Sequence, residues 1–276
     1  LLHSGMTDGL SEAAVEYVEM HTDAIETARA SLSQPYIISP PSVQYVEFMT
    51  WQEEAHFLEN LMFQRARVLG FEGDQSGKAA LLIDLLRIGQ GVSEHGSLMT
   101  FELSARSQNK VFRDILDSVD DFNAEQLRML ITNLESISDS IVPFENVLAI
   151  QYAHWNRVVE AAQMRMNPFS QILSSIETRL GQKHVDTVLE NVKMIFDDEV
   201  ARVYGTILRL RVTLFEREEG RPPNSLEDVL DSRPVPIDPI TGNPFQYSNG
   251  KIFSLGSRSD GSDVNEANAV DRKAVF

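Results

Sequence analysis

The sequence predicts a mainly α fold, in which an antiparallel array of helices is followed by a small α+β module. Apolar residues recur at every third or fourth position through most of residues 1–198, which is the spacing of one helical face. After Glu219 the composition changes, because prolines and glycines crowd residues 220–244 and short β-type runs follow. We therefore expect a helical domain over residues 1–198 and a C-terminal module over residues 199–276, which combines a long helix, a proline-rich loop, a β-hairpin and an acidic loop.

Three helices are expected in the first part of the chain. The first occupies roughly the opening 35 residues and ends in a connector at 33–42 that holds three prolines. A long second helix runs from Ser42 to about Leu69 and carries an apolar stripe. The third starts near Lys78 and can continue past a break near Gly96. Because its first half is apolar on nearly all sides, we expect it to be the central buried helix.

Helix start signals place the later elements. Asp121 and Asn123 precede a strongly periodic run, and both are favoured N-cap residue types. Pro143 stands where proline suits the first turn of a helix. Two more helical stretches follow, at about 170–180 and 184–218.

A β-hairpin is predicted in the C-terminal module. Residues 245–248 and 251–256 are β-type runs, and Asn249-Gly250 stands between them. This dipeptide is the strongest short-range hairpin signal, because both of its residues tolerate positive φ.

A turn is predicted just before the hairpin. Asp238 before a proline favours a turn, and Gly242 can adopt positive φ, so this segment indicates turn chemistry rather than a binding site. Tyr247 and Phe253 are expected to cover the end of the preceding helix near Leu214.

Short motifs follow one another in this tail in a specific order. They are Leu214-Phe215, Gly220 with Pro223, Ser225-Leu226-Glu227-Asp228, Asp238-Pro239, Gly242-Asn243-Pro244-Phe245 with Tyr247, and Phe253-Ser254-Leu255-Gly256. Over roughly residues 200–265 this order resembles the C-terminal half of the major pseudopilin of type II secretion. The chain departs from that family at Ile240-Thr241, where the usual turn has a single residue, and in a longer loop after Gly256.

The resemblance implies a calcium ion, because in pseudopilins the loop after this last motif holds one. Calcium takes six to eight oxygen ligands, and an ion can order a loop too polar to form a core of its own. The candidate ligands are six residues with side-chain or backbone oxygens: Leu255, Ser257, Asp260, Asp263, Asn265 and Glu266. Asp260 and Asp263 are the main candidates, and the resemblance assigns backbone carbonyls to Leu255 and Ser257. The alternative is a solvated acidic loop without an ion. The loop lacks the EF-hand spacing.

The helical part resembles a second group of proteins. Residues 80–112 and 122–137 are similar to segments of uncharacterised membrane-anchored bacterial proteins that carry such tails. This resemblance implies a place outside the cytoplasm, in the periplasm or at the cell surface, and an anchor upstream of the first residue. No stretch of the chain reaches the roughly 18 apolar residues that span a bilayer, so membrane contact is expected only through such an anchor.

Enzyme-like signals are few. Glu53 and His56 form a Glu-x-x-His pair on one helical face, but a di-iron bundle needs two such motifs and the chain has one. Residues 73–78 partly match the phosphate-loop motif, but the spacing of the motif residues is wrong. A loop between helices is the simpler interpretation. We find no convincing active site and expect a protein that is not an enzyme.

The charge and composition of the chain limit the classes of partner that it can bind. The formal net charge of −17 disfavours nucleic acid and anionic membrane surfaces, and it serves either solubility or affinity for divalent cations. The absence of cysteine excludes disulfides and thiolate metal sites. We therefore expect a non-enzymatic structural or interaction protein of the cell envelope, with a protein or polysaccharide partner. The alternatives are a subunit of a pseudopilus-like secretion assembly and a metal-dependent helical-bundle enzyme built around Glu53 and His56.

Overall fold

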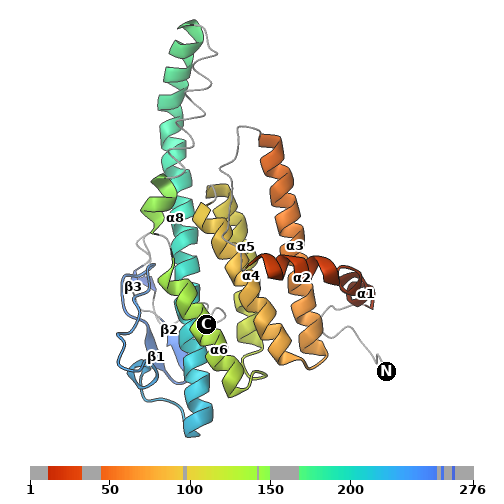
Figure 1. Ribbon diagram of the computed structural model, residues 1–276. Coiled ribbons are helices and arrows are strands. Elements are labelled where there is room, and N and C mark those ends of the chain that lie inside the picture. The colour runs from red at the N-terminus through yellow and green to blue at the C-terminus, as the bar shows by residue number, and fades with distance from the viewer. Residues whose placement is uncertain are drawn as a thin grey trace.

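The mainly helical fold is confirmed in a computed structural model (Figure 1). The structure describes residues 12–32, 45–95, 98–141, 143–149, 168–253, 256–257 and 263–264. The helices are α1 (Glu12–Met20), α2 (Thr22–Ser31), α3 (Tyr45–Phe71), α4 (Gln75–His95), α5 (Leu98–Asp117), α6 (Ala124–Asp139), α8 (Pro168–Glu219) and the 3₁₀ helix η1 (Leu226–Val229). The strands are β1 (Gln246–Ser248), β2 (Lys251–Phe253), β3 (Gly256–Ser257) and β4 (Asp263–Val264).

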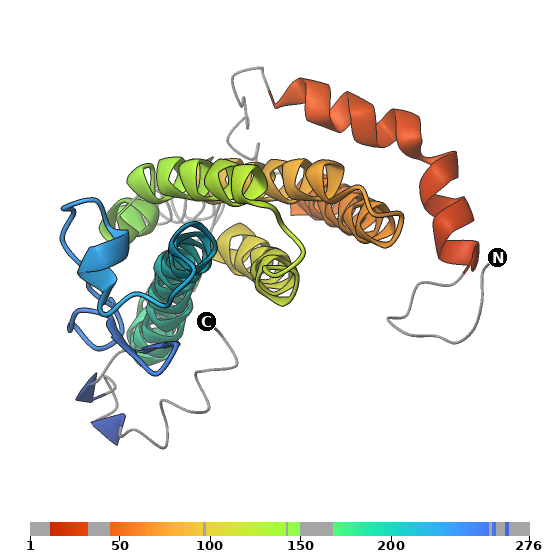
Figure 2. The same cartoon turned by 90° about the horizontal axis from the view of Figure 1, so that it is seen from below.

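The long helices form two layers. Seen from below, α3, α4 and α6 make one row, and α5 and α8 make the other (Figure 2). Helix α4 contacts α3, α5 and α6, which confirms that it is the central helix of the array. Helices α1 and α2 cross the outside of this array, and the first half of α8 projects beyond it (Figure 1).

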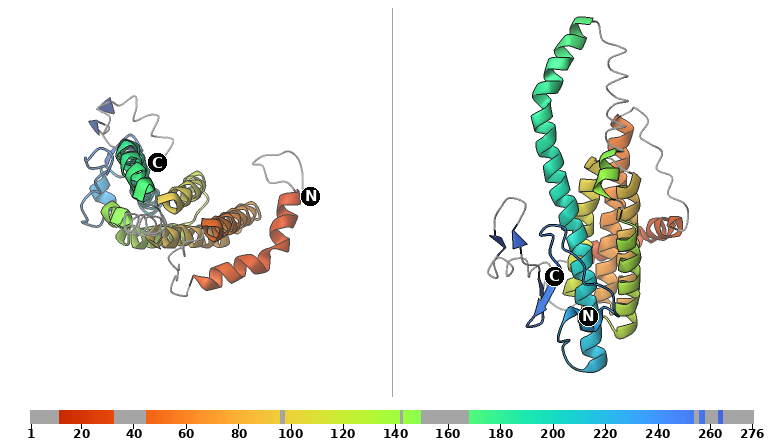
Figure 3. Two further views of the ribbon diagram at one scale, coloured as in Figure 1. Left: turned by 90° about the horizontal axis from the view of Figure 1, so that it is seen from above. Right: turned by 90° about the vertical axis from the view of Figure 1, so that its left-hand side faces the viewer.

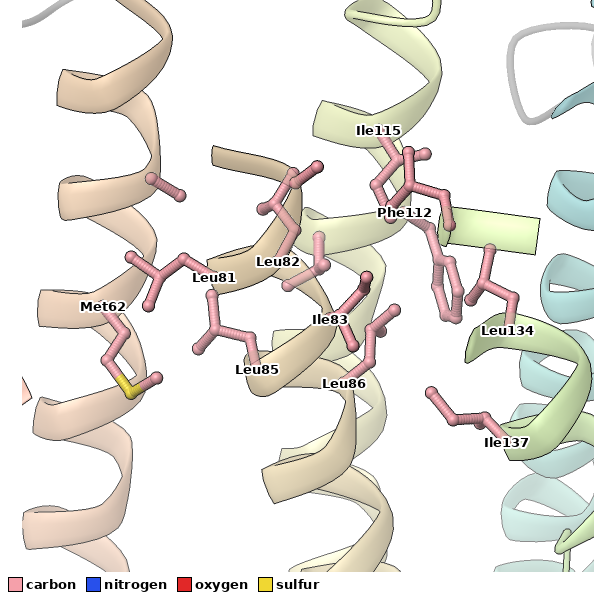
Figure 4. Packing of buried hydrophobic residues seen from close by; sticks show 14 of the residues in the cluster. Met62, Leu81, Leu82, Ile83, Leu85, Leu86, Phe112, Ile115, Leu134 and Ile137 are labelled. Atoms are coloured by element: carbon pink, nitrogen blue, oxygen red, sulfur yellow. The ribbon is translucent and has the colours of Figure 1, made fainter. Parts of the chain in front are cut away.

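Apolar side chains from four helices meet around α4. Met62 of α3, Phe112 and Ile115 of α5 and Leu134 of α6 are almost completely buried (Figure 4). They pack against a run of buried residues in α4 that shows why its sequence is apolar on nearly all sides: Leu81, Leu82, Ile83, Leu85, Leu86 and Ile88. Each fully buried aliphatic side chain contributes about 1.5–3 kcal/mol, so this cluster supplies most of the driving force for the array.

The cap predicted at Asn123 is confirmed. Its side-chain oxygen accepts a hydrogen bond from the backbone N–H of Gln126 at 3.0 Å, and its own N–H donates to Gln126 Oε1 at 2.8 Å. This reciprocal pair satisfies donors that the first turn of α6 would otherwise leave unpaired.

The first helix differs from the prediction, because it breaks into α1 and α2 at His21. A straight helix of this length would span about 30 Å and run past the edge of the array. The bend at His21 lets Val18 of α1 and Ile25 of α2 both reach the core. Helix α4 also begins earlier than expected, at Gln75, because Asp74 Oδ1 caps it by accepting from the N–H of Gly77 at 2.8 Å.

The predicted break between 180 and 184 is wrong. Helix α8 is continuous from Pro168 to Glu219 and passes straight through Gly181. A glycine inside a helix costs only about 1 kcal/mol relative to alanine, and packing further along α8 outweighs that cost. Of the helix predicted from Pro143, residues 144–149 are helical and residues 150–167 lie outside the described chain.

A second, smaller core forms where the tail folds back on α8 (Figure 3). Strands β1 and β2 pair antiparallel, with Tyr247 opposite Ile252, and Ile237 bridges Pro244 just before them. The cluster combines residues of α8, η1 and the hairpin: Ala201, Leu208, Val212, Leu226, Val229, Leu230, Phe245 and Ile252.

Tyr247 of the hairpin packs at the end of α8 in one cluster with Phe215, as expected, but Leu214 itself faces away from the hairpin. Leu214 packs against the first core, together with Ile207 and Leu210, whereas the hairpin packs beside Leu208 and Val212. Positions 208, 212 and 215 follow helical spacing on the face opposite the array, so α8 is shared between two cores. The division into residues 1–198 and 199–276 stays a prediction.

Candidate functional site

The turn before the hairpin is held by Asp238, as predicted. This side chain is buried, and its carboxylate accepts from the N–H of Ile240 at 3.0 Å and from Thr241 Oγ1 at 3.1 Å. Its backbone carbonyl accepts from the N–H of Gly242 at 2.8 Å, and Gly242 has the positive φ of +70° that the turn requires. The oxygens of Asp238 therefore stabilise the turn itself.

The predicted hairpin is confirmed and leads directly to the predicted calcium loop. Asn249 and Gly250 have φ values of +53° and +74°, as a type I′ turn requires. The returning strand β2 carries the buried Ile252 against α8. It thereby anchors the chain just before the segment in which calcium ligands are expected.

The structure places two of the six predicted ligand residues opposite each other. Ser257 of β3 pairs with Asp263 of β4 in an antiparallel ladder, next to the pair of Gly256 and Val264. Directly opposed residues in such a ladder have Cα atoms about 4.5–5.5 Å apart. The other four predicted residues, Leu255, Asp260, Asn265 and Glu266, lie outside the described residues.

Calcium prefers carboxylate and carbonyl oxygens, and its binding at this ladder stays a prediction.

Of the Glu-x-x-His pair, the structure describes the side chain of His56. His56 is exposed, and its Nδ1 lies 3.9 Å from Oε2 of Glu59 one turn later. The side chain of Glu53 lies outside the described residues. Among the residues whose side chains are described, no three His, Cys, Asp or Glu residues lie close enough to hold a metal ion.

The lysine of the phosphate-loop-like segment has a structural role. Lys78 lies in the first turn of α4 and is buried. Its Nζ donates to Ser118 Oγ at 2.6 Å and lies 2.9 Å from Asp114 Oδ2. The lysine thus joins α4 to the end of α5. Of the segment 73–78, only the start forms the predicted loop, and the rest belongs to α4.

An arginine joins the tail to the helical array. Arg211 of α8 donates to Glu135 Oε1 of α6 at 2.6 and 3.0 Å, to the carbonyl of Val229 at 2.7 Å and to Asp231 at 3.1 Å. Arg233 also reaches Glu135, at 3.2 Å. Burial lowers the pKa of Arg211, but the carboxylates of Glu135 and Asp231 outweigh it and raise this pKa, so the guanidinium is always charged.

No family model matches this chain, and no curated protein or solved structure is similar to it. Function therefore has to be inferred from the residues and their geometry. No helix in the described part of the chain combines the length and apolar character needed to cross a bilayer.

Two buried carboxylates, Glu59 and Glu199, were missed by the sequence reasoning. Glu199 lies on the face of α8 that also carries Val192 and Val203, at a position where the helical pattern favours an apolar residue. A glutamate at a position where the periodicity favours an apolar residue was the signal by which the sequence could have indicated a buried Glu199. Its partners could not be read from the sequence, because they lie on other helices.

Proposed function

We propose that this protein is a non-enzymatic structural or interaction protein of the bacterial cell envelope, whose C-terminal module is stabilised by calcium. The helical array would hold a protein or polysaccharide partner, and an anchor would keep the molecule outside the cytoplasm. The proposal depends on the pseudopilin-like order of motifs in the tail. The observation that carries it is the antiparallel pairing of Ser257 with Asp263, which brings two of the six predicted ligand residues opposite each other.

The packing of the tail supports this proposal. Phe245 and Ile252 are buried against α8 beside Leu226 and Val229 of η1, so the segment before the loop is a folded unit with its own core. A loop attached to such a unit starts from a fixed base. A fixed base lowers the entropy that calcium binding has to overcome.

The charge of the chain is compatible with a divalent cation. With a net charge of −17, the protein attracts cations from solution. Extracellular calcium modules bind with a Kd of about 10⁻⁴ to 10⁻³ M, and such a site is filled where free calcium is in the millimolar range. Binding at this affinity suits an ion that stabilises structure outside the cytoplasm.

Calcium titration of the purified protein by isothermal calorimetry tests the proposal. We expect one site with a Kd of about 10⁻⁴ to 10⁻³ M, weakened at least tenfold in the double variant Asp260→Asn/Asp263→Asn. The matched control is Asp120→Asn/Asp121→Asn, which removes two exposed acids from the loop between α5 and α6 and should bind as the wild type does. Equal binding by both double variants, or no binding by the wild type, would contradict the proposal.

The same tail motifs also fit a subunit of a pseudopilus-like secretion assembly. The two functions differ in the upstream sequence, because an assembly subunit needs a membrane helix with a prepilin cleavage signal. Elemental analysis of the same preparation addresses the metal-enzyme alternative at Glu53 and His56. Stoichiometric iron, zinc or manganese in the absence of calcium would favour that enzyme over a calcium-stabilised module.

A further inference from the structure

A layer of buried polar groups connects α8 to α5, and α5 to the backbone of α4, within the otherwise apolar core. Glu199 of α8 is 8% exposed, and Gln108 and Ser104 of α5 are 7% and 2% exposed. Burying a carboxyl group is costly unless it is hydrogen-bonded or neutralised. The contacts of Glu199 show which of these applies.

The layer is built from hydrogen bonds across three helices. When the Gln108 carboxamide is oriented with Nε2 toward α8, Nε2 donates to Glu199 Oε1 at 2.6 Å, and Gln108 Oε1 accepts from Ser104 Oγ and from the N–H of Gln90, both at 3.2 Å. Ser104 Oγ also lies 2.8 Å from the carbonyl of Gly89, so its single hydroxyl proton is donated either to that carbonyl or to Gln108 Oε1. A Cβ at Gly89 would lie 2.3 Å from the Gln108 side chain, so only glycine leaves room for this arrangement.

A separation of 2.6 Å between Glu199 Oε1 and the end of the Gln108 side chain requires a proton between the two atoms. The amide supplies it when Glu199 is ionised. When Glu199 is protonated, its O–H can supply it instead, with the carboxamide turned so that Nε2 donates to Ser104 Oγ at 3.2 Å. The other carboxyl oxygen, Oε2, has no hydrogen-bond partner among the described residues.

Few charges act on Glu199. On α8 itself these are Arg202, which binds Asp198 at 2.7 Å, and Asp198. The polar groups that α4 and α5 contribute to the layer are uncharged, since they are the backbone of Gly89 and Gln90 and the side chains of Ser104 and Gln108.

The acidic residues Glu135 of α6 and Glu59 of α3 interact with groups other than Glu199. On α6, Glu135 is bound to Arg211, about three turns further along α8. On α3, the buried acid is Glu59, which bonds Ser107 and is influenced by Lys110. No described helix therefore provides a cation dedicated to Glu199.

We propose that Glu199 is a proton-operated latch that holds the middle of α8 against α5. With the carboxyl group neutral, the polar layer is compatible with the closed core. Once Glu199 is ionised, the layer contains a buried carboxylate with one unpartnered oxygen, and separation of α8 would let water solvate it.

The direction of the pH effect follows from burial. Burial raises the pKa of Glu199 from 4.5 to about 8, with Arg202 opposing and Asp198 reinforcing the shift. Below pH 4.5 the residue is protonated in both the closed and the open state, and the latch is fully effective. As the pH rises from 4.5 to 8 only the open state ionises, so the equilibrium constant for opening increases up to tenfold per pH unit and then levels off.

Two measurements on the whole chain test this latch. Carbon-13 NMR of glutamate-labelled protein, with the signal assigned through Glu199→Gln, reports the titration of Glu199 directly. Hydrogen–deuterium exchange between pH 5 and pH 9, corrected for the intrinsic exchange rate, reports the opening of residues 192–206. Glu190→Gln, which removes an exposed acid from the same helix, is the matched control.

We expect a Glu199 signal that titrates near pH 8. In the wild type and Glu190→Gln, opening of residues 192–206 should increase up to tenfold per pH unit between pH 5 and pH 8. In Glu199→Gln it should be independent of pH. Titration of Glu199 below about pH 5.5, or the same pH dependence in all three proteins, would overturn the proposal. If Glu199→Gln does not fold, Glu199→Asp assigns the signal and the NMR titration decides.

Discussion

At the scale of single residues, Arg211 connects parts of the chain that are far apart in sequence. Its guanidinium joins α8 to Glu135 of α6, to Val229 at the end of η1 and to Asp231 just after it. Asp231 and Ser232 have φ values of +48° and +68°, which non-glycine residues rarely adopt. Such backbone persists only where the surroundings enforce it, and Arg211 is one of the groups that hold this segment, together with the turn bond from the N–H of Arg233 to the carbonyl of Leu230.

Replacement of Arg211 should therefore be costly. We expect Arg211→Met to lower the free energy of unfolding by about 2–4 kcal/mol, because it leaves Glu135 and the Val229 carbonyl short of a donor. Arg128, which pairs with Glu218 at the exposed surface, is the control, and Arg128→Met should cost about 0–1 kcal/mol. Urea unfolding followed by circular dichroism measures both. Equal losses in the two variants would show that Arg211 does not join the tail to the array.

At the scale of the elements, the start of helix α6 is fixed by hydrogen bonds between residues close in sequence. The capping box at Asn123 is local, since both of its hydrogen bonds connect residues three apart. It should fix the start of α6 independently of the rest of the fold.

Removal of this cap gives a prediction for α6. Asn123→Ala should lower the free energy of unfolding by about 1 kcal/mol, because it removes the acceptor for the N–H of Gln126. Ser136→Ala, at an exposed position inside the same helix, should change it by no more than about 0.5 kcal/mol. Thermal unfolding of both variants measures the difference. A cost for Ser136→Ala as large as that for Asn123→Ala would argue against the cap.

Elements that are determined by residues close to one another in the sequence could be predicted from it. Asn123, the central apolar helix and the Asn249-Gly250 hairpin were all correctly placed, because residue type and periodicity determine them. The bend at His21 was not predictable, because it depends on where the edge of the array lies. Continuity through Gly181 depends on packing elsewhere along α8, which outweighs the local cost of glycine.

The two candidate sites also differ in how much of each could be predicted from the sequence. Ser257 and Asp263 were predicted as ligands from a motif order, and the structure shows that their backbones pair, while their role as ligands stays a prediction. The polar layer around Glu199 could not be foreseen in full, since its partners, Gln108 and Gly89, come from two other helices. A sequence pattern can mark Glu199 as out of place, but only the fold shows what it contacts.

At the scale of the whole molecule, α8 is the element on which both cores are built. One face of it carries Val203, Ile207 and Leu210 into the helical array, and the opposite face carries Leu208 and Val212 into the tail core. The tail is therefore attached to the array along a packed helix, and anything that stabilises the tail also stabilises α8. A ligand at 100 times its Kd adds about 2.7 kcal/mol to the state that binds it.

Hydrogen–deuterium exchange of the wild-type protein, with 10 mM calcium and then with excess chelator, tests the calcium-stabilised tail most directly. We predict that calcium slows exchange in the hairpin and the ladder, residues 246–264, and leaves α3 and α4 unchanged. The same exchange in both conditions throughout residues 246–264 would contradict it.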